Sequence, residues 1–483
     1  MVAHEIFFEC EGVADRSETA VLTANGRYAL SRPYEVTLTL SCRTTGGWPT
    51  ETIEQLLTRP CKVSFEPVAH EIHGVLRSIR LLPILDPARP TYEAILVPAL
   101  DRLTLDRGSR IFQDETWPAI VHDILDRHAI RHELRLNAQY PTREYTVQYE
   151  ESDFDFISRL LEHHGIFYFF EQTPDGELLV IADGNDAFQA LEGREQIDYT
   201  IQGNALWESF ETASVTHLDQ TIEVRPATVQ LKDYNWRTPA VAIEGSADAD
   251  ATTGVGEVQA YADHVKDPTE AATLAQIRAE ELMATRERFT GRTSEMRLQP
   301  GHRFLLVGYP SPDLDIDYVI TEVADAFVTA AAEGGGASAQ RSFTAIRVTV
   351  PYRPPRVTRK PRVDGFIHAI VDGEVPGMAA PLDTLGRYKL RFAFDRADAG
   401  AARASRWVRM AQSSTGADYG MHLPLHIGCE VAVLHLAGDP DRPVILGAIP
   451  NAETTSPVTR DDATKSRIRT KAGILIELED SGP

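Results

Sequence analysis

Histidines that lie close together in the sequence are the most obvious candidate metal ligands, because paired imidazoles bind transition metals. His70 and His73 lie in a segment with the pattern of a β-strand, and His163 and His164 end a short helical pattern. Side chains three positions apart in a strand point to opposite faces of the sheet, so His70 and His73 would not share one ion. This spacing therefore favours structural histidines.

Two carboxylates, Asp439 and Asp441, have the spacing of a candidate catalytic or metal-binding pair. They lie within residues 438–443, GDPDRP, a composition that is typical of a tight turn. In such a turn Asp439 accepts hydrogen bonds from its own backbone, and Arg442 pairs with a carboxylate. The sequence favours this turn over a reactive pair.

The four cysteines, Cys10, Cys42, Cys61 and Cys429, are far apart and include no C-x-x-C pair. This pattern argues against a disulfide framework and against a zinc ribbon. The glycine-rich residues 333–338 are followed by no Lys-Ser/Thr, so they do not form a phosphate-binding loop. We therefore predict no catalytic residue, no organic cofactor and no bound metal.

The elements that would position side chains are clearest in residues 150–183. Ser152 and Asp155 begin a helix with a capping pattern, Phe154 and Ile157 lie on its apolar stripe, and Gly165 is the expected stop. The sequence then changes to a strand, a Thr-Pro-Asp-Gly turn and a second strand. We predict a short helix packed on a buried hairpin, which is core and not a catalytic site.

Length and charge exclude several classes of protein. A chain of 483 residues is expected to form three or four domains. The net charge of −23 argues against binding nucleic acid, which requires a basic face. No basic and apolar leader begins the chain, and no apolar stretch reaches membrane length, so we predict cytoplasmic synthesis, no signal peptide and no stable membrane insertion.

Taken in order, the chain is mainly β with a small α/β insert. Residues 1–350 alternate between strand patterns and turns, and residues of about 111–165 have a mixed α/β character. A helix begins at Asp267, which is followed by Pro268 and Glu270 in a capping pattern, and extends to about Arg288. Residues 351–361 form a basic, proline-rich linker, which we predict to be a stiff connection.

Residues 362–452 contain five short strand patterns within about 90 residues, which indicates a small closed barrel of the OB type. These patterns cover residues 363–371, 387–394, 406–412, 430–436 and 444–449.

A second linker, residues 453–467, precedes an alternating segment, residues 468–483. Ile474, Ile476 and Leu478 point to one side of this segment, and Glu477 and Glu479 point to the other. One amphipathic strand cannot bury its apolar side chains alone. We therefore predict that Ile474, Ile476 and Leu478 contact other copies of the chain.

Six motifs, in this order, resemble the VgrG family of spike-tip proteins from type VI secretion systems. They are EESDFDFISRLLEHHGIFYFF (150–170), DYNWRTP (233–239), DTLGRYKLRFAFDR (383–396), RWVRMAQ (406–412), GCEVAVLHLAGDPDRPVILGAIPN (428–451) and IRTKAGILIELED (468–480). The resemblance covers nearly the whole sequence. Members of the family usually continue into a long β-helical needle, so residues 468–483 are expected to form only its first strands, and no appended effector domain is expected within the 483 residues.

The resemblance implies two hub-type β-barrels with the α/β insert, then an OB-fold barrel, then the start of a trimeric β-helix. It also implies a homotrimer that sits on a tube protein (Hcp-like) and a baseplate, and that carries a needle-tip protein and effectors or adaptors. Such a spike assembles in the bacterial cytoplasm and is ejected to the extracellular space or into a target cell.

Three other functions remain as alternatives at this stage. A cell-wall hydrolase spike of a phage-like particle would need paired carboxylates in a dedicated domain between barrel and needle, where this chain has only the linker 453–467. A spike of an extracellular contractile injection system would have the same motifs. An OB domain that binds single-stranded nucleic acid would need a basic groove.

Overall fold

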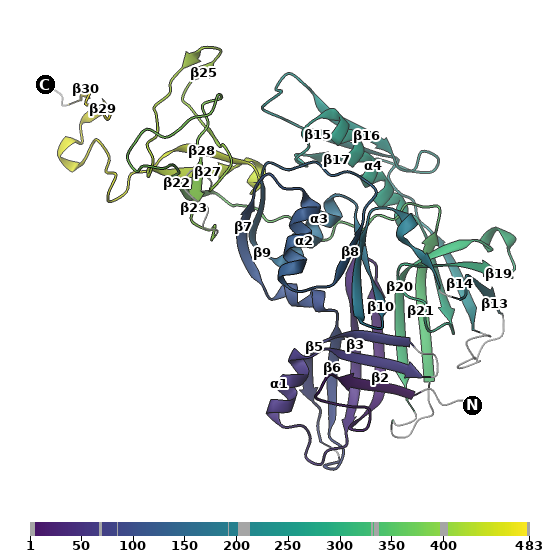
Figure 1. The fold of residues 1–483 in the computed structure, drawn as a ribbon. Helices are drawn as coiled ribbons and strands as arrows, with labels where there is room; N and C mark the ends of the chain where they lie inside the picture. Colours follow the sequence, from purple (N-terminus) through teal and green to yellow (C-terminus); the bar gives the residue numbers. More distant parts are fainter. Residues whose placement is uncertain are drawn as a thin grey trace. The chain divides into compact units, whose positions relative to one another are not determined.

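The computed structural model describes residues 5–66, 70–84, 86–191, 193–200, 213–329, 332, 338–396 and 404–480 (Figure 1). The predicted glycine-rich loop, 333–338, lies outside these residues except for Ser338, and so do residues 481–483 of the predicted needle start. The chain forms two compact units. The first contains residues 1–106, 121–140 and 152–359, and the second contains residues 107–120, 141–151 and 360–483.

The first unit begins with six strands that follow one another in a curled sheet. Their hydrogen-bonded order is β1 (Glu5–Cys10), β4 (Cys61–Glu66), β5 (His70–Leu81), β6 (Thr91–Val97), β3 (Arg32–Cys42) and β2 (Thr19–Ala29). Alternate side chains are buried along β1 and β3, as a barrel with a filled interior requires. The Thr19 hydroxyl donates a hydrogen bond of 3.4 Å to the Phe8 carbonyl and so connects the first and last strands. Helix α1 (Thr50–Thr58) packs beside β5 through its buried Leu56.

A second barrel in the same unit closes completely. Its ring runs through β20 (Asp317–Val328), β21 (Ser338–Arg347), β18 (Glu287–Thr293), β14 (Ser214–Ile222), β13 (Gln196–Tyr199) and β19 (His302–Val307) and returns to β20. Phe289, Phe304 and Tyr318 are fully buried inside it. Because β2 also pairs with β20, both barrels belong to one continuous 13-stranded sheet, which ends at β12 (Gln189–Ala190).

The predicted helix and hairpin of residues 150–183 are confirmed. Helix α3 (Asp153–His163) begins where the Ser152 hydroxyl accepts a hydrogen bond of 3.0 Å from the Asp155 amide, and Gly165 has a φ of +67° after its end. The fully buried Phe156 replaces the predicted Phe154 on the helix face, and Phe154 is only partly buried. Strands β10 (Phe167–Thr173), β11 (Gly176–Ala182) and β8 (His132–Arg135) form the adjoining sheet.

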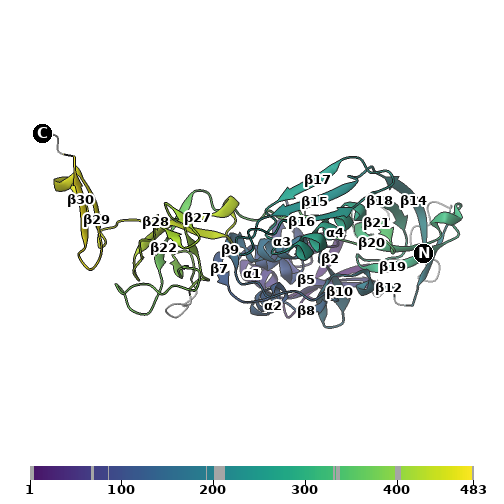
Figure 2. The ribbon, with the colours of Figure 1, turned by 90° about the horizontal axis from the view of Figure 1, so that it is seen from above.

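Helix α4 (Pro268–Ala284) lies along a separate three-stranded sheet of the first unit (Figure 2). The sheet consists of β16 (Ile243–Asp248), β15 (Thr228–Asp233) and β17 (Glu257–Tyr261). The Asp267 carboxylate accepts a hydrogen bond of 2.9 Å from the Glu270 amide, which confirms the predicted start of the helix. The helix ends earlier than Arg288 because β18 begins at Glu287 and pairs there with β14.

The proline-rich segment that leaves the first unit is bound along that unit. Tyr352 belongs to a buried aromatic cluster with Phe167 and Phe188. The Arg353 guanidinium donates a hydrogen bond of 2.7 Å to Glu280 on α4. The Glu162 carboxylate accepts hydrogen bonds from the backbone and the hydroxyl of Thr358, and burial raises its pKa. Residues 351–359 are therefore fixed by specific side-chain contacts in addition to their prolines.

The second unit contains the five strands predicted for the OB barrel. The order is β23 (Leu390–Phe392), β22 (Phe366–Val371), β27 (Glu430–His435), β28 (Pro443–Ala448) and β24 (Arg409–Met410). Paired hydrogen bonds between Tyr388 and Val408 connect the first and last strands and close the ring. A small hairpin, β25 (Thr415–Gly416) and β26 (Tyr419–Gly420), extends one loop.

The second unit also includes part of the predicted α/β insert. Strands β7 (Arg107–Phe112) and β9 (Thr146–Ser152) form a two-stranded ribbon, and Ile111 packs against the core of the OB barrel. Helix α2 (Trp117–Arg127) follows β7. The predicted insert is thus divided between two compact units, which no local sequence pattern indicated.

Candidate assembly surface at the terminal hairpin

The last two strands of the chain form a hairpin whose residues are mostly exposed. Strands β29 (Lys465–Arg469) and β30 (Leu475–Glu479) are antiparallel, with Ile468 opposite Ile476 and Ser466 opposite Leu478. The turn is closed by two backbone hydrogen bonds of 2.9 Å, Thr470 to Ile474 and Gly473 to Thr470. Since a sheet places paired residues on one side, Ile468, Ile476 and Leu478 share one face. We call this the apolar face.

The apolar face is open to solvent. The exposed fractions are 46% for Ile468, 59% for Ile476 and 65% for Leu478. An isolated two-stranded hairpin is marginally stable in water unless a third element covers one of its faces. The side chains of the apolar face therefore form a surface that is suited to association with other chains.

The opposite face carries paired charges. Arg467 contacts Glu477 at 2.7 Å and Asp462 at 3.1 Å, and Lys465 contacts Glu477 at 3.1 Å and Glu479 at 3.7 Å. Hydrogen bonds from Arg467 and Lys465 lower the pKa of Glu477. These charges compensate one another within a single chain, so this face requires no partner.

The predicted contact residues are only partly grouped by the fold. Ile476 and Leu478 lie together on the apolar face, whereas Ile474 lies in the turn that precedes β30 and is also exposed. Ile468, which completes the apolar face, was not among the predicted contact residues. A single alternating segment was expected there, and only the turn at Thr470–Gly473 brings Ile468 opposite Ile476. Contact with other copies of the chain stays a prediction for all of them.

The Asp439 and Asp441 pair is a structural turn within the second unit. The Asp439 carboxylate accepts a hydrogen bond of 2.9 Å from the Asp441 amide, as predicted. The Lys360 ammonium lies 2.6 Å from a carboxylate oxygen of each. Asp441 also accepts a hydrogen bond of 2.7 Å from the Val147 amide in β9. Both carboxylates are buried and engaged, so the pair fixes the turn, and the absence of a reactive site here stays a prediction.

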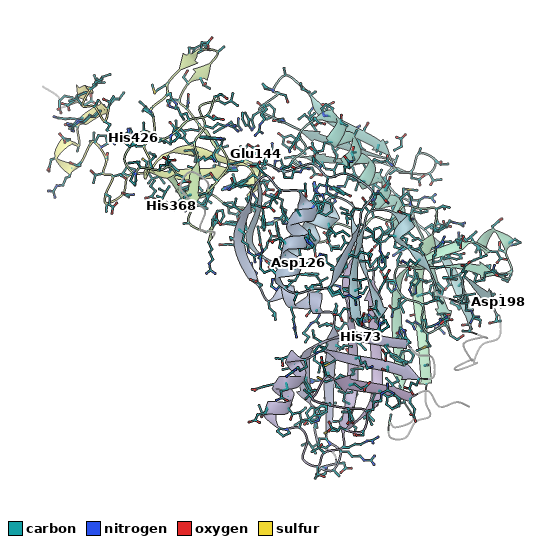
Figure 3. The ribbon with its side chains drawn as sticks, viewed as in Figure 1. His73, Asp126, Glu144, Asp198, His368 and His426 are labelled. Carbon is teal, nitrogen blue, oxygen red and sulfur yellow. The ribbon has the colours of Figure 1, made fainter. Side chains whose placement is uncertain are left out.

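Groups of candidate metal ligands appear that sequence spacing did not indicate, and the group at helix α2 is one of them. His122 and Asp126 lie one turn apart on α2, with Asp126 labelled in Figure 3, and His132 begins β8. The His122 Nδ1 and His132 Nε2 atoms are 2.7 Å apart, and His132 Nδ1 donates to the Ile130 carbonyl at 2.8 Å. His122 Nε2 also lies 3.3 Å from Asp126. The polar atoms of His122, Asp126 and His132 therefore have hydrogen-bond or ionic partners without a bound ion. The absence of bound metal stays a prediction, which elemental analysis after chelator dialysis tests.

A cavity of about 970 Å³ in the first unit contains three histidines. It is lined by His70, His73, Arg297, Gln299 and His302, among others. Burial lowers the pKa of His70 well below its usual value and lowers that of His302 to about 4. Both imidazoles are therefore neutral at pH 7. Ser64 also lines the cavity, but its hydroxyl donates a hydrogen bond of 3.1 Å to the Glu71 carboxylate, so this geometry does not define a nucleophile and its base.

Two barrels joined by one sheet, followed by a closed OB barrel and an amphipathic hairpin, define the class of proteins that form the hub and spike of contractile tails. Residues 27–329 match the family described as phage tail baseplate hub (GPD). Residues 379–449 match the family described as type VI secretion system/phage-baseplate injector OB domain. The hub match covers more than half of the sequence, and the chain belongs to the phage tail baseplate hub family.

Curated relatives include VgrG proteins. The actin cross-linking toxin VgrG1 of Vibrio cholerae is 31% identical over 435 residues, which cover 87% of this chain and 39% of that protein. The type VI secretion system spike protein VgrG1b of Pseudomonas aeruginosa is 30% identical over 460 residues, which cover 92% of this chain and 61% of that protein. The chain thus spans about two fifths and three fifths of the lengths of these relatives.

Solved structures show the same fold. The Escherichia coli c3393 protein, described as a type VI secretion component with structural similarity to the T4 phage tail proteins gp27 and gp5, aligns with a TM-score of 0.68 and 24% identity. That alignment covers 92% of this chain and 99% of the other. A Francisella PdpA–VgrG complex aligns with a TM-score of 0.63 and 9% identity, over 99% of this chain and 83% of the other. Among the described residues, no helix is both long and apolar enough to cross a membrane.

Proposed function

We propose that this protein is the hub and spike component of a type VI contractile injection machine and that it works mechanically as a homotrimer. The observation that carries the proposal is the combination, in one chain, of a hub region, an injector OB domain and an apolar face that one chain leaves exposed. Such a combination suits a rigid body that transmits force and needs no catalytic turnover.

The partners follow from the same proposal. The hub region binds an Hcp-like tube protein and the baseplate, and the hairpin side carries a needle-tip protein with effectors or adaptors. The spike assembles in the bacterial cytoplasm and is ejected to the extracellular space or into a target cell. Relatives that are named as spike proteins support these assignments. The net charge of −23 supports the absence of a nucleic-acid partner.

The alternative of a wall hydrolase has no support from the fold. Such a spike would need a dedicated domain between the OB barrel and the needle. Residues 449–464, between β28 and β29, are all described and contain one short 3-10 turn, Arg460–Asp462. The VgrG1 relative is named as an actin cross-linking toxin, and this chain covers 39% of it.

Two measurements test the proposal. Light scattering of the purified chain should give three times the chain mass, and a stable monomer at micromolar concentration would contradict the trimer. In a producing bacterium, the chain should appear in the medium only when the contractile sheath is functional. Equal release from a strain that lacks the sheath would contradict the role in injection.

A further inference from the structure

Two cysteines that are distant in the sequence lie directly opposite each other in the first barrel. Cys10 ends β1 and Cys61 begins β4, and they are partners in the antiparallel ladder. Their side chains are almost fully buried, with exposed fractions of 2% and 3%. The sequence argued against a disulfide framework because 51 positions separate them, yet the register brings them together.

The pair occupies the position in an antiparallel ladder that suits a cross-strand bond. The Glu11 amide donates to the Pro60 carbonyl at 3.0 Å, so the neighbouring pair is the hydrogen-bonded one. The Cys10 amide instead donates to the Ala14 carbonyl at 2.8 Å. Cys10 and Cys61 therefore form a non-hydrogen-bonded pair, in which Cα atoms are about 4.5 Å apart and side chains approach closely. That separation is within the range that a disulfide spans.

We infer that Cys10 and Cys61 form a reversible disulfide when the protein passes from a reducing to an oxidising compartment. Passage between compartments rests on the proposed function, whereas the pairing rests on the register alone. The other two cysteines lack this arrangement, because Cys42 is opposite Thr19 and Cys429 lies outside the strands. The bond would fasten β1, which is the first strand of the sheet and, among the described residues, pairs along its length with β4 alone.

The chemistry is thiol–disulfide exchange with a small-molecule or protein disulfide as oxidant. A hydrogen bond from the Cys61 thiol lowers the pKa of Cys10, and the charge of Arg59 lowers it further, so Cys10 is the attacking thiolate. Attack on the oxidant breaks its disulfide and leaves a mixed disulfide on Cys10. The Cys61 thiolate then attacks the Cys10 sulfur. One oxidant disulfide becomes two thiols, and the protons of Cys10 and Cys61 pass to them.

Access to the buried pair requires local opening of β1. This strand has six residues and lies at one end of the sheet, and such edge elements open at a lower free energy than the whole domain. Oxidation should therefore proceed slowly in folded protein, and the disulfide should persist until a reductant is added. Closing a loop of this length in the unfolded chain is expected to raise the unfolding midpoint of the first unit by about 5 °C.

The test uses the full-length chain with oxidised glutathione as oxidant. In a Cys42→Ala/Cys429→Ala variant, peptide mapping should find a single Cys10–Cys61 disulfide that dithiothreitol reverses. Adding Cys10→Ser should leave at most a glutathione adduct on Cys61. If the double variant does not fold, the same mapping applies to the wild-type chain, where Cys42 and Cys429 should remain thiols. Four free thiols, or a disulfide through Cys42 or Cys429, would overturn the inference.

Alkylation of thiols in cells separates this inference from the proposed function. The chain should be reduced in the producing cytoplasm and should carry the disulfide after ejection. An ejected chain that remains reduced would overturn the redox inference and leave the spike function intact. A chain that is never ejected would contradict the proposed function while the purified protein still reports on the pair.

Discussion

The OB barrel and the terminal hairpin are neighbours in the sequence and both consist of alternating strands, yet their burial is opposite. In the barrel, Val431, Val433 and Ile445 are fully buried, whereas every residue of β30 is exposed. The barrel buries its apolar side chains because the bridge between Tyr388 and Val408 closes the ring. Closure of the sheet, and not the alternating pattern, decides whether a strand completes its own core.

The hairpin would therefore become more stable if its apolar face were buried against other chains. Burying a side chain such as Ile or Leu completely contributes about 1.5–3 kcal/mol. Three residues of the apolar face in each of three chains would supply a favourable term well above that of a single core position. Association through the hairpin is thus separate from folding of the OB barrel, and substitutions should affect one without the other.

The largest effect is expected for Ile476→Asp on the apolar face. In a trimer this change would bury three unpaired carboxylates around one axis, and each costs about 3–5 kcal/mol. The chain should become monomeric by light scattering, while the unfolding midpoint of the OB barrel stays unchanged. Leu475→Asp is the matched control, because Leu475 is opposite Arg469 on the other face and is similarly exposed. Equal loss of trimer in both variants would contradict the assignment of the faces.

A smaller but purely internal effect is expected for Tyr388→Ala in the OB barrel. The ring is fully buried, and its hydroxyl accepts a hydrogen bond of 3.1 Å from the Leu425 amide. Its removal should destabilise the barrel by about 4 kcal/mol, which differential scanning calorimetry would detect. Tyr419→Ala, at an exposed tyrosine of the same unit, should change the midpoint little. If the two variants lowered the unfolding midpoint equally, the buried Tyr388 side chain would not be a main source of barrel stability.

A pH effect of intermediate size should also separate the two regions. Burial lowers the pKa of His435 to about 4, although Asp439 and Asp441 oppose the shift. In the unfolded chain a histidine has a pKa near 6.5. Folding with a neutral His435 is therefore fully favourable above pH 6.5, and the barrel loses stability as the pH falls towards 4. The full loss is about 3 kcal/mol. Denaturant midpoints of the OB barrel should fall across this range, and the slope should disappear in His435→Gln.

The hairpin should respond over a different pH range. The pKa values of Glu477 and Asp462 are lowered by their basic partners, so their contribution is lost only when the pH falls below the ordinary carboxyl range. Between pH 6.5 and 5 the trimer should therefore persist while the barrel weakens. If light scattering showed that the trimer dissociates between pH 6.5 and 5, protonation of a histidine would weaken association and not only the barrel.

The smallest effect is expected for Arg467→Gln on the charged face. Exposed ion pairs contribute little, because water and salt screen them. Trimer mass at physiological salt should remain unchanged, since Glu477 keeps its contact of 3.1 Å with Lys465. If this variant dissociated as readily as Ile476→Asp, charge pairing would be the source of association, and the apolar face would not be.

Local patterns in the sequence were sufficient to predict elements whose stabilising contacts are themselves local. Helix α3 was predicted from Ser152 and Gly165, and the five OB strands from their turns. Long-range pairings were not accessible in this way. Ile468 lies opposite Ile476 because of a turn at residues 470–473, within a segment whose alternating pattern predicted a single strand. Cys10 lies opposite Cys61 only through the register of two strands. Similarly, His122 and His132 converge because a turn connects α2 to β8.

The pairing of β2 with β20 has a consequence for synthesis of the chain. Thr23 is opposite Val328, so the two strands that join the barrels are 328 − 23 = 305 positions apart. At translation rates of about 5–20 residues per second, β2 waits roughly 15–60 s for its partner to leave the ribosome. During that time one edge of β2 presents unpaired amide and carbonyl groups, which favour pairing with the wrong strand. Production of this chain is therefore expected to depend on chaperones that hold a nascent edge strand.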